Sequence, residues 1–411
     1  MTASFIQTNR SVVAIIFVGM LLRIIWALYV PVEPVSDSKA YATFALNIWQ
    51  HGVYGWTPDE PTAYWAVGTS ALTAASFFLL GNTFAGVVFL NLLTGLAILV
   101  LTWGLGVRFF GERSAFWAVV LVAFWPNMIF FTSILSSELY FMALTMGGLF
   151  FWSNTTGRPW LNLLLAAFIW GLACYIRPVI LLFPVAMVIA ALSQGWHGTL
   201  FAAIKAAVCV ILIILIVSPW TARNETVIGK AYLVSSNFGT NLWMGNNPES
   251  DGGYTPLPAE VSGMSEVERE EYLGQKAKDY ILENPRRFAS TVGKRLIDLH
   301  SRETIGVVWN QAALVRYVGD TGVFLLKLVA SGYWVLLVLC GLAGVALQFR
   351  KESFKALFHP VFGGWAYFTA VHMIIVSGDR YHMPSAPFVA LLAGVTIAAM
   401  MRWIKDRQFK S

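Results

Sequence analysis

Four carboxylates crowd into one short polar loop that follows a long apolar segment. The loop covers residues 31–64 and holds Glu33, Asp37, Asp59 and Glu60, from a total of 22 acidic residues in the chain. Carboxylates beside a membrane are unfavourable unless water, a cation or a substrate meets them. This loop is therefore the first candidate for chemistry, and a carboxylate held in such a place can act as a general base.

Asp37 is the strongest candidate of the four. Ser36 or Asp37 can cap a short helix that we expect to continue to about Gln50. Tyr41, four residues further on, shares a helical face with Asp37. A carboxylate at an ordered helix start could remove the proton of a sugar hydroxyl. The alternative interpretation is that Asp37 serves only as the N-cap of this helix.

Glu138 is the second candidate, in the turn Ser136-Ser137-Glu138 between two apolar segments. The topology described below places this turn at the same level of the membrane as Asp37. Glu138 could orient a substrate, support Asp37 or help to bind a cation. The alternative is that it only caps the helix that follows.

Two arginines lie where a cation is unfavourable without an anionic partner. Arg177 lies between two apolar segments, and Arg380 follows Ser377-Gly378-Asp379. Guanidinium groups are well shaped to bind a phosphate. The alternatives are that Arg177 extends its head group to the membrane surface and that Arg380 pairs locally with Asp379. For Arg23, inside the first apolar segment, we expect one of these two structural roles.

The remaining chemical signals are weak. The histidines are scattered without metal-ligand spacing, so we predict no zinc site. The chain contains no phosphate-binding glycine loop of the Walker type, so ATP hydrolysis is not expected. Cys174, Cys209 and Cys340 all fall within apolar segments, so we expect no structural disulfide.

The composition is that of a polytopic membrane protein. Of the 411 residues, 57% are hydrophobic and 12% are charged, and the mean hydropathy is +0.65. A soluble domain has roughly 25% charged residues. The net charge of +6 need not indicate nucleic acid, because membrane proteins concentrate Lys and Arg in their cytoplasmic loops. Arg10 precedes the first apolar segment without a small-residue cleavage site after it, which is typical of an uncleaved signal anchor.

We expect an all-α fold with about ten transmembrane helices, because a span needs about 20 apolar residues. With both termini cytoplasmic, the short outer loops are poor in basic residues, as the positive-inside rule requires. Residues 62–80 are also apolar, but a crossing there would place Arg108, Arg113 and Arg350 outside. We therefore predict a juxtamembrane helix on or dipping into the outer surface. The expected spans lie near residues 12–30, 84–107, 114–133, 138–155, 160–176, 179–195, 202–220, 324–348, 359–377 and 385–403.

Residues 221–323 form the only long polar stretch, which this topology places outside. Ser265 and Glu268 have the spacing of a capping box, which predicts a helix over about 266–282. A second helix is expected from about 286 to 300. The chain thus divides into an N-terminal transmembrane catalytic module with its first outer loop, a helical extracytoplasmic region and C-terminal transmembrane helices, which cover residues 1–220 (loop 31–83), 221–323 and 324–411.

Several short motifs follow one another along almost the whole chain. They are Asp37 with Tyr41, Ser137-Glu138, Arg177-Pro178, Pro219-Trp220 with Arg223-Asn224, Gly239 to Pro248, and Arg380-Tyr381 with Pro384. In this order they resemble the glycosyltransferase-C superfamily of integral membrane enzymes. More narrowly, the chain resembles the bacterial branch that contains protein O-mannosyltransferases and the lipid A aminoarabinose transferase. The stretch from Tyr64 to Ser70 departs from the family, because it keeps a glycine but lacks the prolines and tyrosine of a Pro-Gly-Tyr-Pro-like motif.

The resemblance implies transfer of a sugar, with inversion, from a polyprenyl-phosphate donor to a glycan, lipid or protein acceptor. The expected place is the extracytoplasmic face of a bacterial inner (plasma) membrane, in modification of the cell envelope. Asp37 would be the catalytic base, and no cofactor is expected, although Asp37 and Glu138 could share a divalent metal. The residues expected to bind substrate are Tyr41, Glu138, Arg177, Arg380, Tyr381 and Asn246, with support from Lys39, Asp59 and Glu60.

Other functions are compatible with many spans and buried arginines. One is a flippase or transporter for a lipid-linked sugar, and another is a ligase that moves a whole glycan. We find no inverted repeat and no paired broken helices of the kind that many transporters have. The large outer polar region also favours an enzyme. A non-catalytic scaffold would leave the outer carboxylates and arginines without a role.

Overall fold

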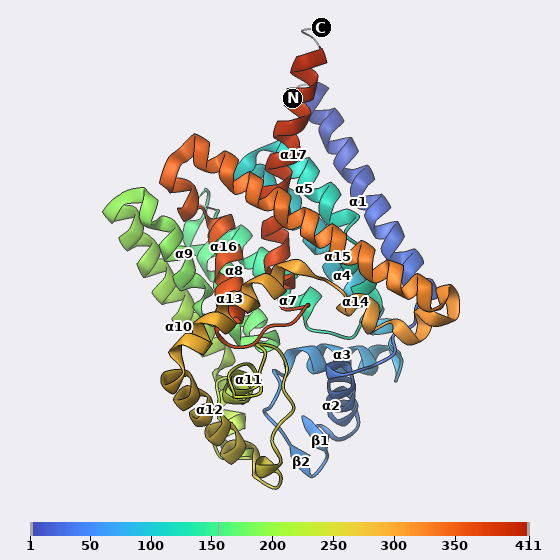
Figure 1. The fold of residues 1–411 in the computed structure, drawn as a ribbon, viewed down its shortest axis with the longest axis vertical. Helices are drawn as coiled ribbons and strands as arrows, with labels where there is room; N and C mark the ends of the chain where they lie inside the picture. The colour runs from blue at the N-terminus through green and yellow to red at the C-terminus, as the bar shows by residue number, and fades with distance from the viewer. Residues whose placement is uncertain (1–2, 155, 409–411) are drawn as a thin grey trace.

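The computed structural model describes residues 3–154 and 156–408, and almost every element in it is a helix. The only sheet in these residues is a small antiparallel hairpin of β1 (Gly55–Thr57) and β2 (Glu60–Pro61). Figure 1 shows that both ends of the chain lie at one end of a helix bundle. The opposite end holds the hairpin with α2 (Asp37–His51), α3 (Gly68–Leu80), α11 (Phe238–Gly245) and α12 (Glu266–Glu283).

The protein is an integral membrane protein. Six helices in the described residues are long and apolar enough to cross a membrane, or seven if the bent pair α5–α6 forms one span. All ten expected spans fall on helical segments, but several of these helices are short, so the number ten stays a prediction. The bundle consists of α1 (Ala3–Tyr29), α4 (Ala85–Phe110), α5 (Glu112–Ala123), α6 (Pro126–Phe130), α7 (Glu138–Trp152), α8 (Pro159–Ile176), α9 (Phe183–Ala191), α10 (Gly195–Ile228), α15 (Gln311–Glu352), α16 (Pro360–Ile374) and α17 (Ala386–Gln408).

Two helices extend beyond their predicted spans and cross the predicted domain boundaries. α10 continues to Ile228, because polar side chains after the apolar segment find partners: the Trp220 indole donates to the Val234 carbonyl at 3.1 Å. α15 begins at Gln311, but Gly319, with φ of 62°, divides it into two helices, and the second begins close to the predicted start near residue 324. The outer region is therefore continuous with the spans on both sides of it.

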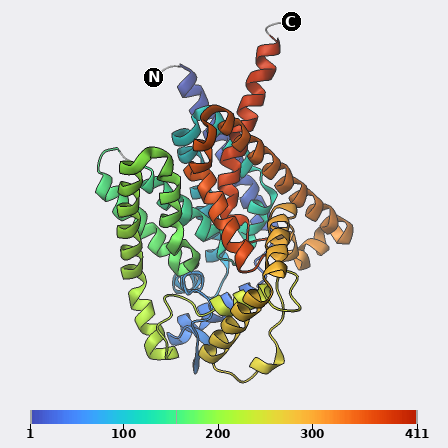
Figure 2. The same ribbon diagram turned by 60° about the vertical axis from the view of Figure 1, so that its left-hand side comes forward.

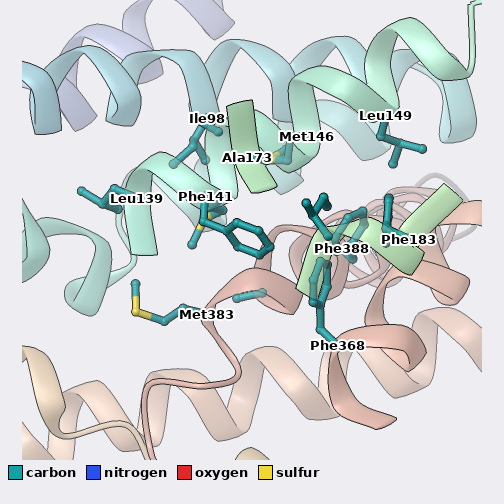
Figure 3. Packing of buried hydrophobic residues seen from close by; sticks show 14 of the residues in the cluster. Ile98, Leu139, Phe141, Met146, Leu149, Ala173, Phe183, Phe368, Met383 and Phe388 are labelled. Carbon is teal, nitrogen blue, oxygen red and sulfur yellow. The ribbon is translucent and has the colours of Figure 1, made fainter. Parts of the chain in front are cut away.

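The core lies between helices that are distant in sequence. Phe183 of α9 stacks on Phe368 of α16 with ring centroids 5.4 Å apart, and Phe388 of α17 lies beside them (Figure 3). Small residues allow close helix crossings. A Cβ on Gly344 of α15 would lie 2.1 Å from the Leu392 carbonyl oxygen of α17. The aromatic stack thus joins C-terminal helices to an N-terminal one, and the Gly344 crossing packs two C-terminal helices together.

α3 has the character expected for residues 62–80. It is 13 residues long, and Figure 1 shows it lying across the end of the bundle. Gly68, Thr69, Ser70 and Ala74 are buried, and such small residues allow close packing against neighbouring helices, whereas Ala71 and Ala75 are exposed. A Cβ on Gly68 would lie 2.7 Å from the Tyr175 carbonyl oxygen, so the start of α3 packs directly on the end of α8.

The outer region forms the two predicted helices. α12 begins after Ser265 with both hydrogen bonds of the capping box, and α13 covers Pro285–Ser301. Both views keep α11 and α12 beside the first outer loop, at the end opposite the termini (Figure 2). Glu266 of α12 joins the outer region to the first outer loop. Its carboxylate accepts from the Thr62 hydroxyl (2.5 Å) and the Ala63 amide (2.9 Å) of that loop, and from the Ser236 hydroxyl (2.6 Å).

Replacement of Glu266 by Ala is expected to destabilise this junction. The change leaves three donors without their acceptor, and the expected loss is about 2–3 kcal/mol, because hydrogen bonds to a charged group are among the stronger ones. Thermal unfolding in detergent and limited proteolysis of the outer region would measure it. Glu271→Ala is the matched control at an exposed position of the same helix, with an expected change within about 0.5 kcal/mol. Equal stability of the two variants would show that the hydrogen bonds of Glu266 do not stabilise the junction.

Arg23 differs from its expected role. Its side chain is fully buried, so it does not extend to the surface, and it does not pair with a carboxylate. It donates instead to the carbonyls of Val122 and Ala123 (both 3.0 Å) and of Gly19 (2.8 Å). The physical reason is that α5 ends at Ala123, and the last carbonyls of a helix lack partners within it.

Candidate active site

Asp37 is the first residue of α2 but does not cap it through its side chain. The residue before it, Ser36, has φ of 50°, and no side-chain cap bond forms at this helix start. The Ser38 hydroxyl donates to the Leu135 carbonyl at 2.7 Å, which ties the first turn of α2 to the turn before α7. The Asp37 carboxylate is therefore available for other partners, and the interpretation of Asp37 as a mere N-cap is wrong.

Glu138 and Arg177 form a buried ion pair beside this turn. Glu138 is the first residue of α7 and its side chain is fully buried, while Arg177 is the residue at which α8 ends before Pro178. An Arg177 nitrogen lies 2.5 Å from a Glu138 oxygen, and Arg177 Nε donates to the Ser137 hydroxyl at 2.9 Å. Arg177 thus points to a carboxylate and not to the membrane surface.

Arg380 joins the two carboxylates. It lies in the segment between α16 and α17, where one terminal nitrogen binds Asp37 and the other lies 3.5 Å from Glu138. The local pair with Asp379 is not formed, because Asp379 accepts from Thr304 instead. Burial alone would lower the pKa of Arg380, but the charges of Asp37 and Glu138 outweigh it and raise that pKa well above its ordinary value. Arg380 therefore stays charged.

These four residues form what we call the charge cluster: Asp37, Arg380, Glu138 and Arg177, in the order of their contacts. The formal charges cancel, and the four side chains are between 0% and 24% exposed. The cluster combines residues from the N-terminal module with one from the C-terminal helices. It can therefore form only in the assembled bundle.

Three tyrosines lie near the charge cluster. Tyr41 is buried on α2, and its pKa is raised first by burial and then by the neighbouring charge of Asp37. Burial also raises the pKa of Tyr64, which feels the charges of Arg269 and Asp37. The Tyr381 ring lies beside Arg380, with the guanidinium carbon 5.4 Å from its centroid. Tyr41 and Tyr64 thus remain neutral hydroxyl donors.

The structure does not bring every predicted site residue to the cluster. Asp59 and Glu60 are exposed around the turn of the β1–β2 hairpin, and Lys39 is exposed on α2. Glu33 pairs at 3.5 Å with Arg316, which is itself largely exposed. Of the four carboxylates in the first loop, only Asp37 enters the cluster.

Asn246 has a structural position that differs from the expected role in substrate binding. Its amide nitrogen donates to the carbonyls of Leu242 (2.8 Å), Ile374 and Ile375 (both 3.1 Å), and its oxygen accepts from Arg295 at 3.1 Å. These bonds use the polar atoms of the side chain to attach α11 to the end of α16.

Two contacts of the site and one neighbouring residue do not follow from the sequence. The Ser137 hydroxyl positions Arg177, the Arg380 guanidinium lies 4.8 Å from the centroid of the Trp309 ring, and Tyr64 lies near Asp37. Ser137 belongs to the Ser137-Glu138 motif, and Tyr64 begins the stretch that departs from the family pattern. Nothing in the sequence distinguishes Trp309 from the 16 other tryptophans.

Asp37 and Glu138 could share a divalent metal only if their carboxylates faced a common point. In the structure, Arg380 lies between them and contacts both. In the part of the chain that the structure describes, no group of three or more His, Cys, Asp or Glu side chains could hold a metal ion. Metal independence of the activity remains a prediction.

Comparison with known proteins identifies the fold. Residues 64–222 match a family described as dolichyl-phosphate-mannose-protein mannosyltransferase. No curated protein matches the chain. The oligosaccharyltransferase AglB from the archaeon Archaeoglobus fulgidus, in complex with an inhibitory peptide and a dolichol-phosphate, matches 99% of this chain and 52% of its own, at 13% identity and a TM-score of 0.57. The same enzyme with Zn and sulfate matches 96% and 50%, at 15% identity and a TM-score of 0.55.

A third structure, ArnT from Cupriavidus metallidurans bound to undecaprenyl phosphate, matches 94% of this chain and 78% of its own, at 13% identity and a TM-score of 0.48. The chain spans about half the length of the AglB chains that it matches. The AglB matches show that the chain has the glycosyltransferase-C fold, which confirms the predicted fold class.

Proposed function

We propose that the protein is a membrane glycosyltransferase that moves a sugar from a polyprenyl-phosphate donor to a lipid-linked glycan, lipid or protein acceptor. The observation that carries the proposal is the charge cluster, which pairs two guanidinium groups with two carboxylates at the edge of the bundle. The family match over residues 64–222 and the fold shared with AglB support it. The AglB neighbour was solved with dolichol-phosphate, a ligand of the proposed donor class.

The donor phosphate would bind the arginines of the cluster. In the absence of donor, Arg380 binds Asp37 and Arg177 binds Glu138, so the formal charges cancel. A phosphate that approaches Arg380 competes with Asp37 for the same N–H donors. Donor binding would thus release the Asp37 carboxylate when a base is needed. Glu138 keeps Arg177 as a partner throughout.

The reaction would be a single displacement with inversion. Asp37 takes the proton from the acceptor hydroxyl, and the oxygen attacks the anomeric carbon of the sugar. The bond from that carbon to the phosphate oxygen breaks, and the leaving polyprenyl phosphate keeps the electron pair. Arg177 and Arg380 stabilise the negative charge that develops on the phosphate. Tyr41, Tyr64 and Tyr381 supply hydroxyls for the sugar.

The charge distribution supports an extracytoplasmic site in a bacterial inner membrane. The two ends of the chain lie at the end of the bundle opposite the outer loop (Figure 1). Basic residues that the topology places with the termini, such as Arg108, Arg350 and Lys405, favour a cytoplasmic location for that end. The region 221–323 then covers the site from outside and helps to select the acceptor.

A transfer assay tests the proposal. Purified protein is given a set of radiolabelled polyprenyl-phosphate sugars and a membrane lipid extract as acceptor. Label in a new product is the expected result and identifies the donor. If no donor is used, and labelled lipid crosses liposome membranes that contain the protein, the function is that of a flippase and the proposal is wrong.

The activity is expected to survive removal of divalent metals. Arg177 and Arg380 supply the positive charge at the site, so incubation with EDTA should change the transfer rate by less than about twofold, far below the effect of losing a catalytic group. Transfer is measured with chelator alone, with added Mg²⁺ or Mn²⁺, and without treatment. Loss of transfer that only a divalent metal restores would contradict this expectation.

The fold match favours one second candidate, which is transfer of a whole glycan. AglB is an oligosaccharyltransferase, and it matches almost the full length of this chain. A monosaccharide-lipid and an oligosaccharide-lipid donor, supplied side by side, separate the two functions. The family match to a mannosyltransferase favours the monosaccharide.

A further inference from the structure

A buried pair of titratable residues lies next to the charge cluster and has no role in the proposed chemistry. Glu303, between α13 and α14 (Ile305–Val308), and His382, two residues after Arg380, are both inaccessible to solvent. His382 Nε2 lies 2.8 Å from a Glu303 oxygen, and the Trp125 indole donates to the other Glu303 oxygen at 2.7 Å. The pair therefore fixes the residue that follows Arg380-Tyr381.

Thr304, the residue after Glu303, fixes Asp379, which directly precedes Arg380. The Thr304 amide donates to Asp379 Oδ2 at 2.8 Å, and the Thr304 hydroxyl donates to the same oxygen. Glu303 is itself attached to α15, because its amide donates to the Ser331 hydroxyl at 3.1 Å. Thr304 thus binds Asp379, the residue before Arg380, and Glu303 binds His382, two residues after Arg380.

Aromatic rings enclose the Glu303–His382 pair. The Trp334 ring stacks on the His382 imidazole at 4.1 Å and also stacks on Trp125 at 5.9 Å. Burial raises the pKa of Glu303 well above its ordinary value and lowers the pKa of His382 to about 3. Both shifts favour the uncharged forms of the two side chains. The contact is a hydrogen bond that lies away from water.

Arg380 needs such support because its partners change in the proposed reaction. When the donor phosphate replaces Asp37 as the partner of the Arg380 guanidinium, the Arg380–Asp37 ion pair no longer determines where Arg380 lies. The contacts of Asp379 and His382 do not involve substrate, so they persist during this exchange. A displacement of a binding group by about 1 Å can cost on the order of 100-fold in rate.

We propose that Glu303, Thr304, Asp379 and His382 are positioning residues that hold Arg380 for the phosphate of the polyprenyl-phosphate donor. The inference rests on the proposed function and deepens it, because it assigns donor affinity to contacts outside the charge cluster. Their loss affects donor binding and leaves acceptor binding unchanged.

Matched variants at Glu303 test this. Glu303→Gln keeps both contacts, because the amide can accept from Trp125 and donate to His382, whereas Glu303→Leu removes both. The probe is undecaprenyl phosphate, whose dissociation constant is measured with purified full-length protein, together with KM for donor and for acceptor. We expect Glu303→Leu to weaken undecaprenyl phosphate binding and to raise the donor KM by about 10- to 100-fold, with an unchanged acceptor KM. Glu303→Gln should stay within about threefold of wild type, because it retains the geometry.

A second pair of variants covers the case in which Glu303→Leu does not fold. Thr304→Val removes the hydroxyl that donates to Asp379, and Thr304→Ser keeps it. Thermal unfolding shows which proteins are folded. Weaker binding in Thr304→Val than in Thr304→Ser, at equal stability, supports the inference.

Three results would overturn the inference. One is wild-type binding of undecaprenyl phosphate by a folded Glu303→Leu protein, or by Thr304→Val if Glu303→Leu does not fold. Another is a loss in folded Glu303→Gln as large as in Glu303→Leu, because a hydrogen-bonding contact predicts rescue by Gln. The third is a wild-type protein that binds no polyprenyl phosphate. This result overturns the proposed function as well, whereas the first two results concern only the variants and leave the proposed function in place.

Discussion

Replacement of Asp37 by Asn is expected to lower the rate of sugar transfer by about 10²- to 10⁴-fold, the usual contribution of a general base. The amide has the shape of the carboxylate but cannot accept the proton of the acceptor hydroxyl. Binding of undecaprenyl phosphate should be retained or become tighter, because Arg380 no longer has to leave an anionic partner. Radiolabel transfer and a binding measurement on the same preparation separate these two effects.

The control for Asp37→Asn is the same change at Asp279, an exposed position of α12 in the outer region. This variant should transfer sugar at the wild-type rate. Unfolding temperatures of both variants exclude a loss of fold. Transfer at the wild-type rate by a folded Asp37→Asn protein would show that Asp37 is not the base.

Replacement of Arg380 by Ala is the second change with a large expected effect. It removes the group that stabilises charge on the leaving phosphate, and removal of one such group costs about 10²- to 10³-fold in kcat. The donor KM should rise too, because Arg380 also binds the phosphate before the reaction. Arg380→Lys keeps a charge but loses the planar fork of donors, so we expect an intermediate loss. Steady-state rates at varied donor concentration give both parameters.

A double variant distinguishes a shared site from two separate defects. Asp37 and Arg380 contact each other, so losses in Asp37→Asn/Arg380→Ala should be smaller than the product of the single losses. The folded state of the Arg380 variants is checked by thermal unfolding, because Glu138 retains only Arg177 as its charged partner. Independent, multiplicative losses would contradict direct cooperation of the two residues.

The sequence predicts those parts of the site that depend on local order. The capping box at Ser265 and Glu268 is complete within four residues, and it forms as expected. α2 and α7 begin at Asp37 and Glu138, where the sequence predicts helix starts, although no side-chain cap bond forms at either start. Topology alone then places Asp37, Glu138, Arg177 and Arg380 at the same end of the bundle, which the structure confirms.

Contacts between distant segments are the part that sequence could not predict. Arg380 and Asp37 are 343 residues apart, and the local alternative, a pair with Asp379, was equally compatible with the sequence. The partner of Arg380 depends on Thr304, because Thr304 donates to Asp379 and Arg380 then pairs with other carboxylates. For the same reason, composition could not show that Asp59 and Glu60 remain at an exposed hairpin turn while Glu138 becomes the second carboxylate of the cluster.

Arg23 imposes an order on the assembly of the protein during its synthesis. Its carbonyl partner in α5 lies 100 residues further along the chain, which at an elongation rate of about 5–20 residues per second corresponds to about 5–20 seconds. Until then α1 carries a cation that the lipid interior disfavours, so it must stay near head groups or the insertion machinery. The arrival of α5 removes this restriction and allows α1 to settle at its final depth. A residue that neither binds substrate nor lies at the surface thus couples insertion of the first helix to synthesis of the fifth.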